Sequence, residues 1–214
     1  MLFTMNTVQA PVRRGRPPKT PRENADTKAH LIRVGLETLT EFGFSATGLD
    51  TILKKAGVPK GSFYHYFKSK EVYGIALVDA YDDYFIAKLS KYLSDESTPP
   101  LERLINFTQS AISGMQKYDF KRGCLVGNLN QELNHLSDEF KVRLLQSYQA
   151  WQTQVEHCLN DAKQSGTIAN SVNTQLMSEY FWIGWEGAVM RAKLTQSSKP
   201  LTLYTEMYLR ALLT

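Results

Sequence analysis

Between Leu49 and Phe67 the sequence predicts two very short helices joined by a tight turn. The first covers 49–56, and the second begins at Lys60 and cannot extend far beyond Phe67. Only Gly57, Val58 and Pro59 separate them, because glycine ends one helix and proline favours the start of the next. A break this short holds two helices at a steep angle, which is the arrangement of a helix-turn-helix.

The second short helix carries an aromatic cluster with an inner and an outer side. Phe63 and Phe67 are spaced i, i+4, so both should face the core of the small bundle. Gly61 and Ser62 are small and allow close approach to a phosphate backbone. The side chains that lie off the core face or add charge at its ends are Lys60, Tyr64, His65, Tyr66 and Lys70. The alternative is that the aromatic residues simply fill a small core.

Positive charge is concentrated in the first third of the chain. Residues 1–71 hold 12 basic and 6 acidic residues, whereas the remainder holds 13 basic and 15 acidic residues. A basic end on a nearly neutral chain indicates a polyanion-binding surface. The chain has 214 residues, of which 43% are hydrophobic, so it can bury a core and should be globular.

Residues 1–24 are expected to form a disordered basic arm. They contain four prolines, five basic residues and few apolar ones. Arg14-Gly15-Arg16-Pro17 resembles the core of an AT-hook, in which extended arginines enter a narrow minor groove. The alternative is a solvated basic tail, and in either case Arg14 and Arg16 should add contacts to DNA phosphates.

The rest of the chain is predicted to be helical throughout. A first helix should begin near Asp26 and end at Gly43, with Thr47 or Asp50 capping the second helix. Further helices are expected at about 70–92, 100–117, 124–135, 138–165, 172–195 and 200–213. No alternating strand pattern or hairpin signal is visible. We therefore expect an all-α protein with a three-helix N-terminal domain and a larger helical C-terminal domain.

Residues 26–72 resemble the DNA-binding domain of the TetR family of bacterial transcriptional repressors. The motifs that match in order and spacing are Phe42-Gly43-Phe44, Thr47-Gly48-Leu49-Asp50-Thr51-Ile52, Ala56-Gly57-Val58 and Lys60-Gly61-Ser62-Phe63-Tyr64-His65-Tyr66-Phe67-Lys68-Ser69-Lys70-Glu71. The resemblance implies a helix-turn-helix domain at 25–72 and a ligand-binding and dimerisation domain at 73–214. It also implies a homodimer that reads a palindromic operator and is released by a small-molecule inducer.

The same resemblance assigns roles to individual residues of the helix-turn-helix. Base-edge contacts are implied for Lys60, Ser62, Tyr64 and His65. Phosphate contacts are implied for Thr47, Tyr66 and Lys70.

The predicted helix at 172–195 carries two different stripes. Gly184, Ala188 and Ala192 recur every four residues and allow a partner helix to approach, which favours a dimer seam completed by Met207 and its neighbours in the last helix. Trp182, Glu186, Val189 and Lys193 lie on nearly the opposite side and favour a ligand chamber, to which Trp151 is also assigned. The alternative for this second stripe is an aromatic core with charged residues at its exposed ends.

Cys124 is the residue with the most distinctive chemical setting in the C-terminal half. It follows Lys121, Arg122 and Gly123 at a predicted helix start, and both features favour the thiolate. A thiolate there would react with electrophiles or oxidants. The alternative is a small buried apolar residue, and Cys158 is expected to be structural.

A second resemblance concerns the C-terminal half. Gly123-Cys124-Leu125-Val126-Gly127-Asn128-Leu129, Leu136-Ser137-Asp138, Trp182-Ile183-Gly184 and Ala192-Lys193-Leu194 are similar to a TetR subgroup that includes N-ethylmaleimide-responsive, reactive-chlorine-responsive and acrylate-responsive repressors. The resemblance implies that Cys124 senses an electrophile, with Lys193 nearby. A non-covalent hydrophobic or aromatic inducer, or control by a protein partner, remains open.

Other functional classes have little support in the sequence. Cys124 with His135 or His157 could form a nucleophile and base, but neither histidine has an evident orienting partner. No metal-ligand spacing and no phosphate-binding glycine loop is present, so neither catalysis, a metal nor a cofactor is expected. The apolar run at 180–190 is too short for a bilayer and contains Glu186, and no export signal is visible, so no membrane contact and a cytoplasmic location are expected.

Overall fold

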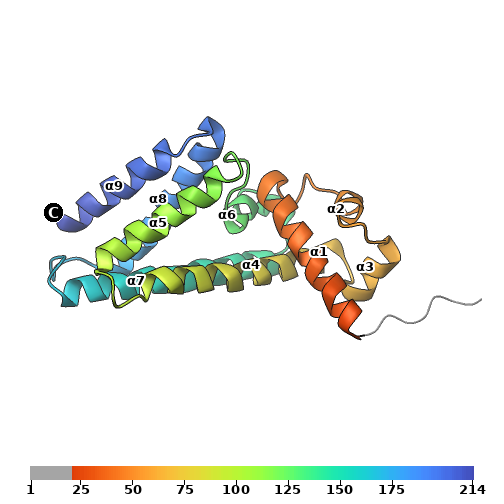
Figure 1. Ribbon diagram of the computed structural model, residues 1–214, viewed down its shortest axis with the longest axis horizontal. Coiled ribbons are helices and arrows are strands. Elements are labelled where there is room, and N and C mark those ends of the chain that lie inside the picture. The colour runs from red at the N-terminus through yellow and green to blue at the C-terminus, as the bar shows by residue number, and fades with distance from the viewer. Residues whose placement is uncertain (1–20) are drawn as a thin grey trace, which may run out of the picture.

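The computed structural model describes residues 21–214, and the regular elements in that range are all helical (Figure 1). The helices are α1 Pro21–Phe42, α2 Leu49–Ala56, α3 Lys60–Tyr66, α4 Lys70–Leu93, α5 Pro100–Gln116, α6 Leu125–Asn130, the 3₁₀ helix η1 Leu133–His135, α7 Asp138–Gln164, α8 Thr174–Thr195 and α9 Lys199–Leu213. The all-α fold class expected from the sequence is confirmed.

Helices α1, α2 and α3 form the small N-terminal unit. Gly57 has φ 64°, a left-handed conformation that glycine adopts without steric cost and that turns the chain sharply after α2. Phe63 and Phe67 are buried and pack edge-on against Tyr73 of α4. Helix α1 also contacts the end of α2, because His30 Nε2 lies 2.9 Å from the Ala56 carbonyl oxygen.

Helix α4 connects the small unit to the larger helical bundle. Ser69 caps its start by accepting a hydrogen bond from the Val72 N–H at 3.1 Å. In Figure 1, α4 leaves the α1–α3 unit and runs along the larger bundle. There it packs on α5 and α7, while α8 lies between α7 and α9.

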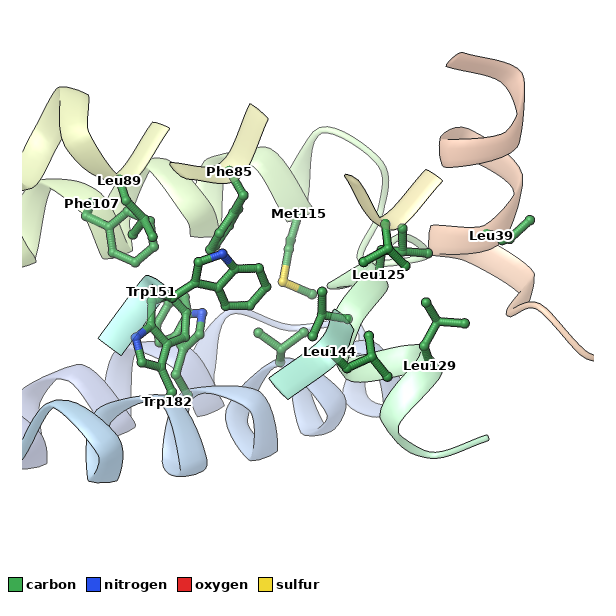
Figure 2. Close-up of a cluster of buried hydrophobic side chains, with 14 of the residues drawn as sticks. Leu39, Phe85, Leu89, Phe107, Met115, Leu125, Leu129, Leu144, Trp151 and Trp182 are labelled. Atoms are coloured by element: carbon green, nitrogen blue, oxygen red, sulfur yellow. The ribbon is translucent and has the colours of Figure 1, made fainter. Parts of the chain in front are cut away.

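The core of the larger bundle is built from aromatic side chains of four helices (Figure 2). The ring of Trp151 lies 4.4 Å from that of Phe85 and 5.2 Å from that of Trp182, measured between centroids. Phe107 packs against Phe85 and Trp182. Burying these large surfaces is the main stabilisation available to a bundle of this size.

The structure departs from the sequence expectations at three element boundaries. Helix α1 begins at Pro21 rather than near Asp26, because proline is tolerated in a first helical turn whose N–H groups have no partner. The helix expected at 124–135 ends at Asn130, and η1 follows separately. Gly48, rather than Thr47 or Asp50, is the N-cap of α2, and it provides no side-chain cap.

Within residues 21–214, none of the helices is both long enough and apolar enough to cross a bilayer.

The close approach of α4 to two phenylalanines generates a stability prediction. A Cβ on Gly74 would lie 2.5 Å from a ring carbon of Phe44 and 2.6 Å from one of Phe140. Both rings are buried and cannot move freely, so Gly74→Ala should lower the free energy of unfolding by about 1–3 kcal/mol. Urea denaturation followed by circular dichroism measures this change.

Gly114→Ala is the matched control, because a Cβ there meets nothing within 4 Å. That variant should be unchanged or stabilised by up to about 1 kcal/mol, the usual gain of alanine over glycine in a helix. Equal destabilisation by the two substitutions would contradict the packing described for Gly74.

Candidate functional site

The outer face of α3 is the exposed surface of the small unit that the sequence assigns to DNA. Tyr64 is 50% exposed, and His65 and Gly61 are also exposed. A side chain added at Gly61 would meet nothing within 4 Å, so the helix can approach another surface closely there. Lys60 is exposed at the start of the helix and forms an ion pair with Asp50 at 3.1 Å.

Two further α3 residues lie at the edge of this face. Ser62 is half-buried. Tyr66 is also half-buried, and its ring packs edge-on to that of His65, with centroids 5.2 Å apart. The outward set therefore comprises Lys60, Gly61, Ser62, Tyr64, His65 and Tyr66.

Two residues expected to touch phosphates are engaged inside the protein. The Thr47 side chain is buried, and its hydroxyl donates to the Gly43 carbonyl at 2.6 Å. Lys70 Nζ donates to the Phe44 carbonyl at 2.7 Å and lies 4.3 Å from the centroid of the Phe44 ring. Partial burial lowers the pKa of Lys70. In the protomer both side chains stabilise the loop between α1 and α2, and the phosphate contacts expected of Thr47 and Lys70 stay predictions.

A chamber of about 390 Å³ lies where the small unit meets the larger bundle. This volume falls within the range of small-molecule sites. Its wall is formed by α1, α4, α5, α8 and the segment before α6. The lining residues are Leu36, Glu37, Thr40, Tyr81, Tyr84, Phe85, Lys88, Ala111, Gly114, Met115, Tyr118, Arg122, Gly123, Cys124, Trp182, Trp185, Glu186 and Val189.

Cys124 lines the chamber and is the N-cap of α6. Its Sγ accepts a hydrogen bond from the Gly127 N–H at 3.4 Å. Burial and the nearby Glu186 carboxylate raise the pKa of the Cys124 thiol to about 12. The expectation that basic neighbours favour the thiolate is therefore wrong: Lys121 pairs with Asp119, and Arg122 pairs with acidic residues of α1.

Glu186 lies beside Cys124 with only part of its hydrogen-bonding capacity used. Its Oε2 accepts a hydrogen bond from the Tyr148 hydroxyl, whereas its buried Oε1 has no partner among the described residues. Burial raises the pKa of Glu186 and also that of Tyr148. Tyr81 approaches the thiol from α4, and burial raises its pKa well above the ordinary value. These groups form a poorly hydrated polar cluster at one end of the chamber.

The other residues assigned to the chamber occupy different positions. Trp182 lines it, whereas Trp151 lies behind Trp182 in the core and donates its indole N–H to Asp82 at 2.7 Å. Lys193 packs against Gly123 at the base of α6, and its Nζ lies 3.5 Å from Asn128 Oδ1. Cys124, Trp182 and Glu186 are thus brought together at the chamber, and Trp151 and Lys193 support it from outside.

The segment around α6 also holds the end of α1. The Gly123 N–H donates to the Thr40 carbonyl at 3.0 Å, and Asn128 Nδ2 donates to the carbonyls of Thr40 at 3.0 Å and Leu39 at 3.3 Å. The last carbonyls of a helix have no partner within the helix itself. The Leu39 carbonyl also accepts from the Gly43 N–H at 3.0 Å, so it is the Thr40 carbonyl for which Gly123 and Asn128 supply partners from a different part of the chain.

Glu132 extends this connection into the loop after α1. Its carboxylate accepts hydrogen bonds from the Phe44 N–H at 3.0 Å and the Ser45 N–H at 2.6 Å. We call Gly123, Asn128 and Glu132 the α1 clamp. Next to it, Arg122 lies 3.8 Å from Glu37 and 3.7 Å from Glu41. The clamp joins the segment that carries Cys124 to the small unit of α1, α2 and α3.

The small residues of α8 do not form an open seam. A Cβ on Gly184 would lie 2.2 Å from the Tyr204 ring of α9, and Ala188 and Ala192 are buried. The expectation that these three residues meet a second subunit is wrong, because Gly184 faces α9 of the same protomer and Ala188 and Ala192 are buried within that protomer. Met207, the fourth residue assigned to the interface, is 52% exposed.

A different face of α8 and α9 is apolar and exposed. On α8 the exposed positions are spaced alternately four and three residues apart, with Gly187 completing the series. The exposed apolar side chains are Leu176, Tyr180, Ile183, Met190 and Leu194 on α8, and Leu203, Met207 and Leu213 on α9.

The residues considered for a metal site or for a nucleophile and base lie apart in the structure. No group of three or more potential metal ligands is present among the described residues. His135 and His157 are exposed, and neither is hydrogen-bonded to Cys124. Arg14 and Arg16 lie outside the described residues.

Three functional positions were not singled out from the sequence: Tyr81 and Lys88 in the chamber, and Glu132 in the clamp. Tyr81 and Lys88 share one face of α4 with Phe85, so helical spacing could have identified the pair. Glu132 gave no such signal, since its partners lie 87 and 88 residues away in the chain.

Comparison with known families agrees with this architecture. Residues 31–72 match the family described as bacterial regulatory proteins, tetR family. Residues 100–208 match the tetracyclin repressor-like C-terminal domain. Together the two matches cover most of the small unit of α1–α3, called the DNA-reading unit below, and most of the larger bundle.

Individual relatives match over most of their length. The transcriptional regulator AcuR of Cereibacter sphaeroides is 45% identical over 202 residues, which cover 94% of this chain and 92% of AcuR. The transcriptional repressor NemR of Escherichia coli K12 is 27% identical over 176 residues, covering 82% of this chain and 88% of NemR.

Solved structures of two regulators are similar to this chain over most of its length. The regulatory protein TetR from Rhodobacter sphaeroides superposes with a TM-score of 0.84 at 46% identity, covering 86% of this chain and 97% of that one. The reduced form of E. coli NemR superposes with a TM-score of 0.79 at 26% identity, covering 86% of this chain and 95% of the NemR chain.

The raised pKa of Cys124 predicts its reactivity with pH. Because the thiolate is the nucleophile, a pKa of about 12 in place of about 8.5 lowers the thiolate fraction at pH 8 by about three orders of magnitude. In a Cys158→Ser background, the rate of alkylation by iodoacetamide should rise about tenfold per pH unit up to pH 10. A rate that levels off near pH 9 would contradict the environment described for the thiol.

Proposed function

Because this chain belongs to the TetR family of bacterial regulatory proteins, we propose that it is a dimeric repressor released from its operator by a small molecule. The inducer site is the chamber beside Cys124. The observation that carries the proposal is the position of this chamber, whose wall includes α1 residues of the DNA-reading unit and Gly123 of the α1 clamp. A molecule that fills the chamber therefore acts directly on the support of the DNA-reading unit.

The outer face of α3 is the part of the protein that reads the operator. Lys60, Ser62, Tyr64 and His65 contact base edges in the major groove, and Tyr66 contacts phosphate. The exposure of Tyr64 and His65 supports these roles. The basic arm with Arg14 and Arg16 adds phosphate contacts in the neighbouring minor groove.

A homodimer places two such faces on a palindromic operator. Its seam is the exposed apolar face of α8 and α9, which a monomer would leave in water. Two copies of α8 and α9 would bury this face as a four-helix bundle with coiled-coil-like spacing. Two-fold symmetry of the protein then matches the two half-sites of the operator.

Release follows from two arrangements of the clamp. In the ligand-free arrangement, Asn128 and Glu132 hold the end of α1 and the loop after it. A ligand that displaces Gly123 or Arg122 changes the support of α1 and therefore the spacing of the two α3 helices in the dimer. A shift between two such states requires that the ligand bind one of them more tightly.

The narrower form of the proposal is an electrophile, such as acrylate, or an oxidant sensed at Cys124. The thiol needs a base, and Glu186, which influences the Cys124 pKa, is the candidate: its carboxylate would take the Sγ proton as Sγ bonds to the terminal alkene carbon and return it to the adjacent carbon. The solved reduced form of the relative NemR supports testing an oxidant. The raised pKa of Cys124 and the aromatic lining favour the second candidate, a non-covalent aromatic or hydrophobic inducer.

Operator release by different compounds tests the proposal and separates the two forms. Gel shifts of wild type should lose the operator complex on addition of acrylate, N-ethylmaleimide or hypochlorite. Cys124→Ser should keep operator affinity and resist release by the electrophiles, since a hydroxyl is a much weaker nucleophile. Cys158→Ser, with its thiol buried against the Pro100 carbonyl, should behave as wild type. Release of Cys124→Ser as easily as wild type would make covalent sensing wrong.

The dimer seam predicts the effect of a charge on α8. Ile183 is 67% exposed in the protomer, so Ile183→Asp should not unfold it. Burying an unpaired carboxylate in the seam should weaken the dimer by about 3 kcal/mol, more than a hundredfold in Kd. Sedimentation velocity measures this change. Leu145→Asp on α7, where the leucine is 62% exposed, is the control and should stay dimeric.

The clamp predicts a loss of operator affinity when Glu132 is neutralised. Glu132→Gln keeps the shape but leaves one acceptor oxygen for the two N–H groups of Phe44 and Ser45. Losing one charge-assisted hydrogen bond should weaken operator binding by about tenfold, measured by fluorescence anisotropy at fixed salt. Glu139→Gln, at an exposed position of α7, should be silent. Unchanged affinity of Glu132→Gln would mean that the clamp does not support the DNA-reading unit.

A further inference from the structure

Lys88 is a cation of the chamber that lacks a counter-ion. It lies on α4 and is partly buried, and burial lowers its pKa. Among the described residues, no carboxylate oxygen lies within 4.0 Å of its Nζ. A partly dehydrated ammonium without an anion is unfavourable, and an anionic ligand would correct this.

Trp182 provides a second unsatisfied group in the same chamber. Its side chain is only 2% exposed, and its indole N–H has no acceptor in the described part of the chain. Indole nitrogens usually find a hydrogen-bond partner when they are buried. An acceptor oxygen on a ligand in the chamber would fill this role.

The other ionic groups around the chamber already have partners, although one carboxylate oxygen of Glu186, Oε1, has none within the described residues. Arg122 pairs with Glu37 and Glu41, and Glu37 also lies 3.7 Å from Lys55. Glu186 accepts a hydrogen bond from Tyr148. Within the described residues, Lys88 is thus the chamber cation that has no carboxylate partner, and the Trp182 indole N–H, buried in the chamber wall, is a donor that has no acceptor.

These two groups lie in a defined order along the chamber. On α4, Tyr81, Phe85 and Lys88 share one face at i, i+4 and i+7. Tyr81 lies beside Cys124 and Glu186, and the Phe85 ring lies 5.8 Å from that of Trp182. Lys88 is therefore at the end away from Cys124, about 10 Å along α4 from Tyr81.

From this order we infer that the chamber binds an extended organic anion, with its carboxylate on Lys88 Nζ and a carbonyl oxygen on the Trp182 indole N–H. The apolar end of the molecule then lies toward Cys124. This inference rests on the proposed function, because it names the ligand class of the same chamber. A three-carbon acid such as acrylate is too short to contact Lys88 and Cys124 together, and it would leave most of the 390 Å³ unfilled.

A suitable probe is 4-oxo-4-phenylbutanoate. It carries a carboxylate, a ketone and a phenyl ring, and it contains no electrophilic double bond, so its binding is independent of thiol chemistry. Two matched compounds isolate the two contacts: 4-oxo-4-phenylbutanamide lacks the charge, and 4-phenylbutanoate lacks the ketone. Titration calorimetry on the full-length dimer gives the three affinities.

Wild type should bind 4-oxo-4-phenylbutanoate about tenfold or more tightly than the amide, as for a charge-assisted hydrogen bond. Lys88→Met keeps the apolar stem and should bring the acid to within about twofold of the amide. Lys91→Met, on the exposed side of α4, should retain the preference. Trp182→Phe should lose the preference for the keto acid over 4-phenylbutanoate and keep the preference for the acid over the amide.

Equal binding of acid and amide by wild type overturns the inference, as does a Lys88→Met variant that keeps the full preference. Failure of all three compounds to bind also overturns it. The proposed function is judged separately by gel shift on the same preparation. It fails if wild type does not bind operator or if no small molecule releases the complex.

Discussion

The end of α1 leaves backbone groups that its own helix cannot satisfy, and a segment more than 80 residues later supplies their partners. Gly123 and Asn128 donate to the Thr40 carbonyl near the end of α1, and Glu132 accepts from the two N–H groups of the following loop. Unmet backbone groups are costly when they are buried, so this contact joins the small unit to the segment around α6, in addition to its packing against α4. The positions of α3 and of the chamber wall at α1 both depend on this contact.

The chamber has two chemically different ends. Toward the clamp lies the cluster of Cys124, Tyr81 and Glu186, in which burial raises the pKa of each group. Toward the opposite end lies Lys88, whose charge has lost part of its hydration. A ligand that meets both ends would lie along α4 and α8, in contact with Trp182. Such a ligand acts on the clamp through Gly123, which borders both the chamber and α1.

Much of the fold could be predicted from local sequence, because local rules set it. The glycine and proline between α2 and α3, the serine cap at Ser69 and the apolar spacing of the long helices are short-range signals. The outward position of Tyr64 and His65 follows from helical spacing in the same way. The interface predicted at Gly184, Ala188 and Ala192 was wrong because small residues indicate only that some helix packs closely against them, and not which helix. At Gly184 that helix is α9 of the same protomer.

The chemistry of Cys124 and the clamp depend on tertiary structure and could not be derived from neighbouring residues. Lys121 and Arg122 precede the cysteine in sequence, yet both are paired elsewhere, and the residue that acts on the thiol is Glu186, from α8. Likewise, nothing near Glu132 in sequence indicates that its carboxylate reaches Phe44 and Ser45. Contacts between residues so far apart in the sequence can be identified only from the folded structure.

The most direct measurement is amide hydrogen exchange at Phe44 and Ser45 in the ligand-free dimer and in the presence of a compound that releases the operator. Exchange at these two N–H groups reports whether the Glu132 carboxylate still holds them. The account predicts that both are protected without ligand and lose protection when the compound binds, while core amides of α7 do not change. Release of the operator with unchanged protection at Phe44 and Ser45 would contradict the role assigned to the clamp.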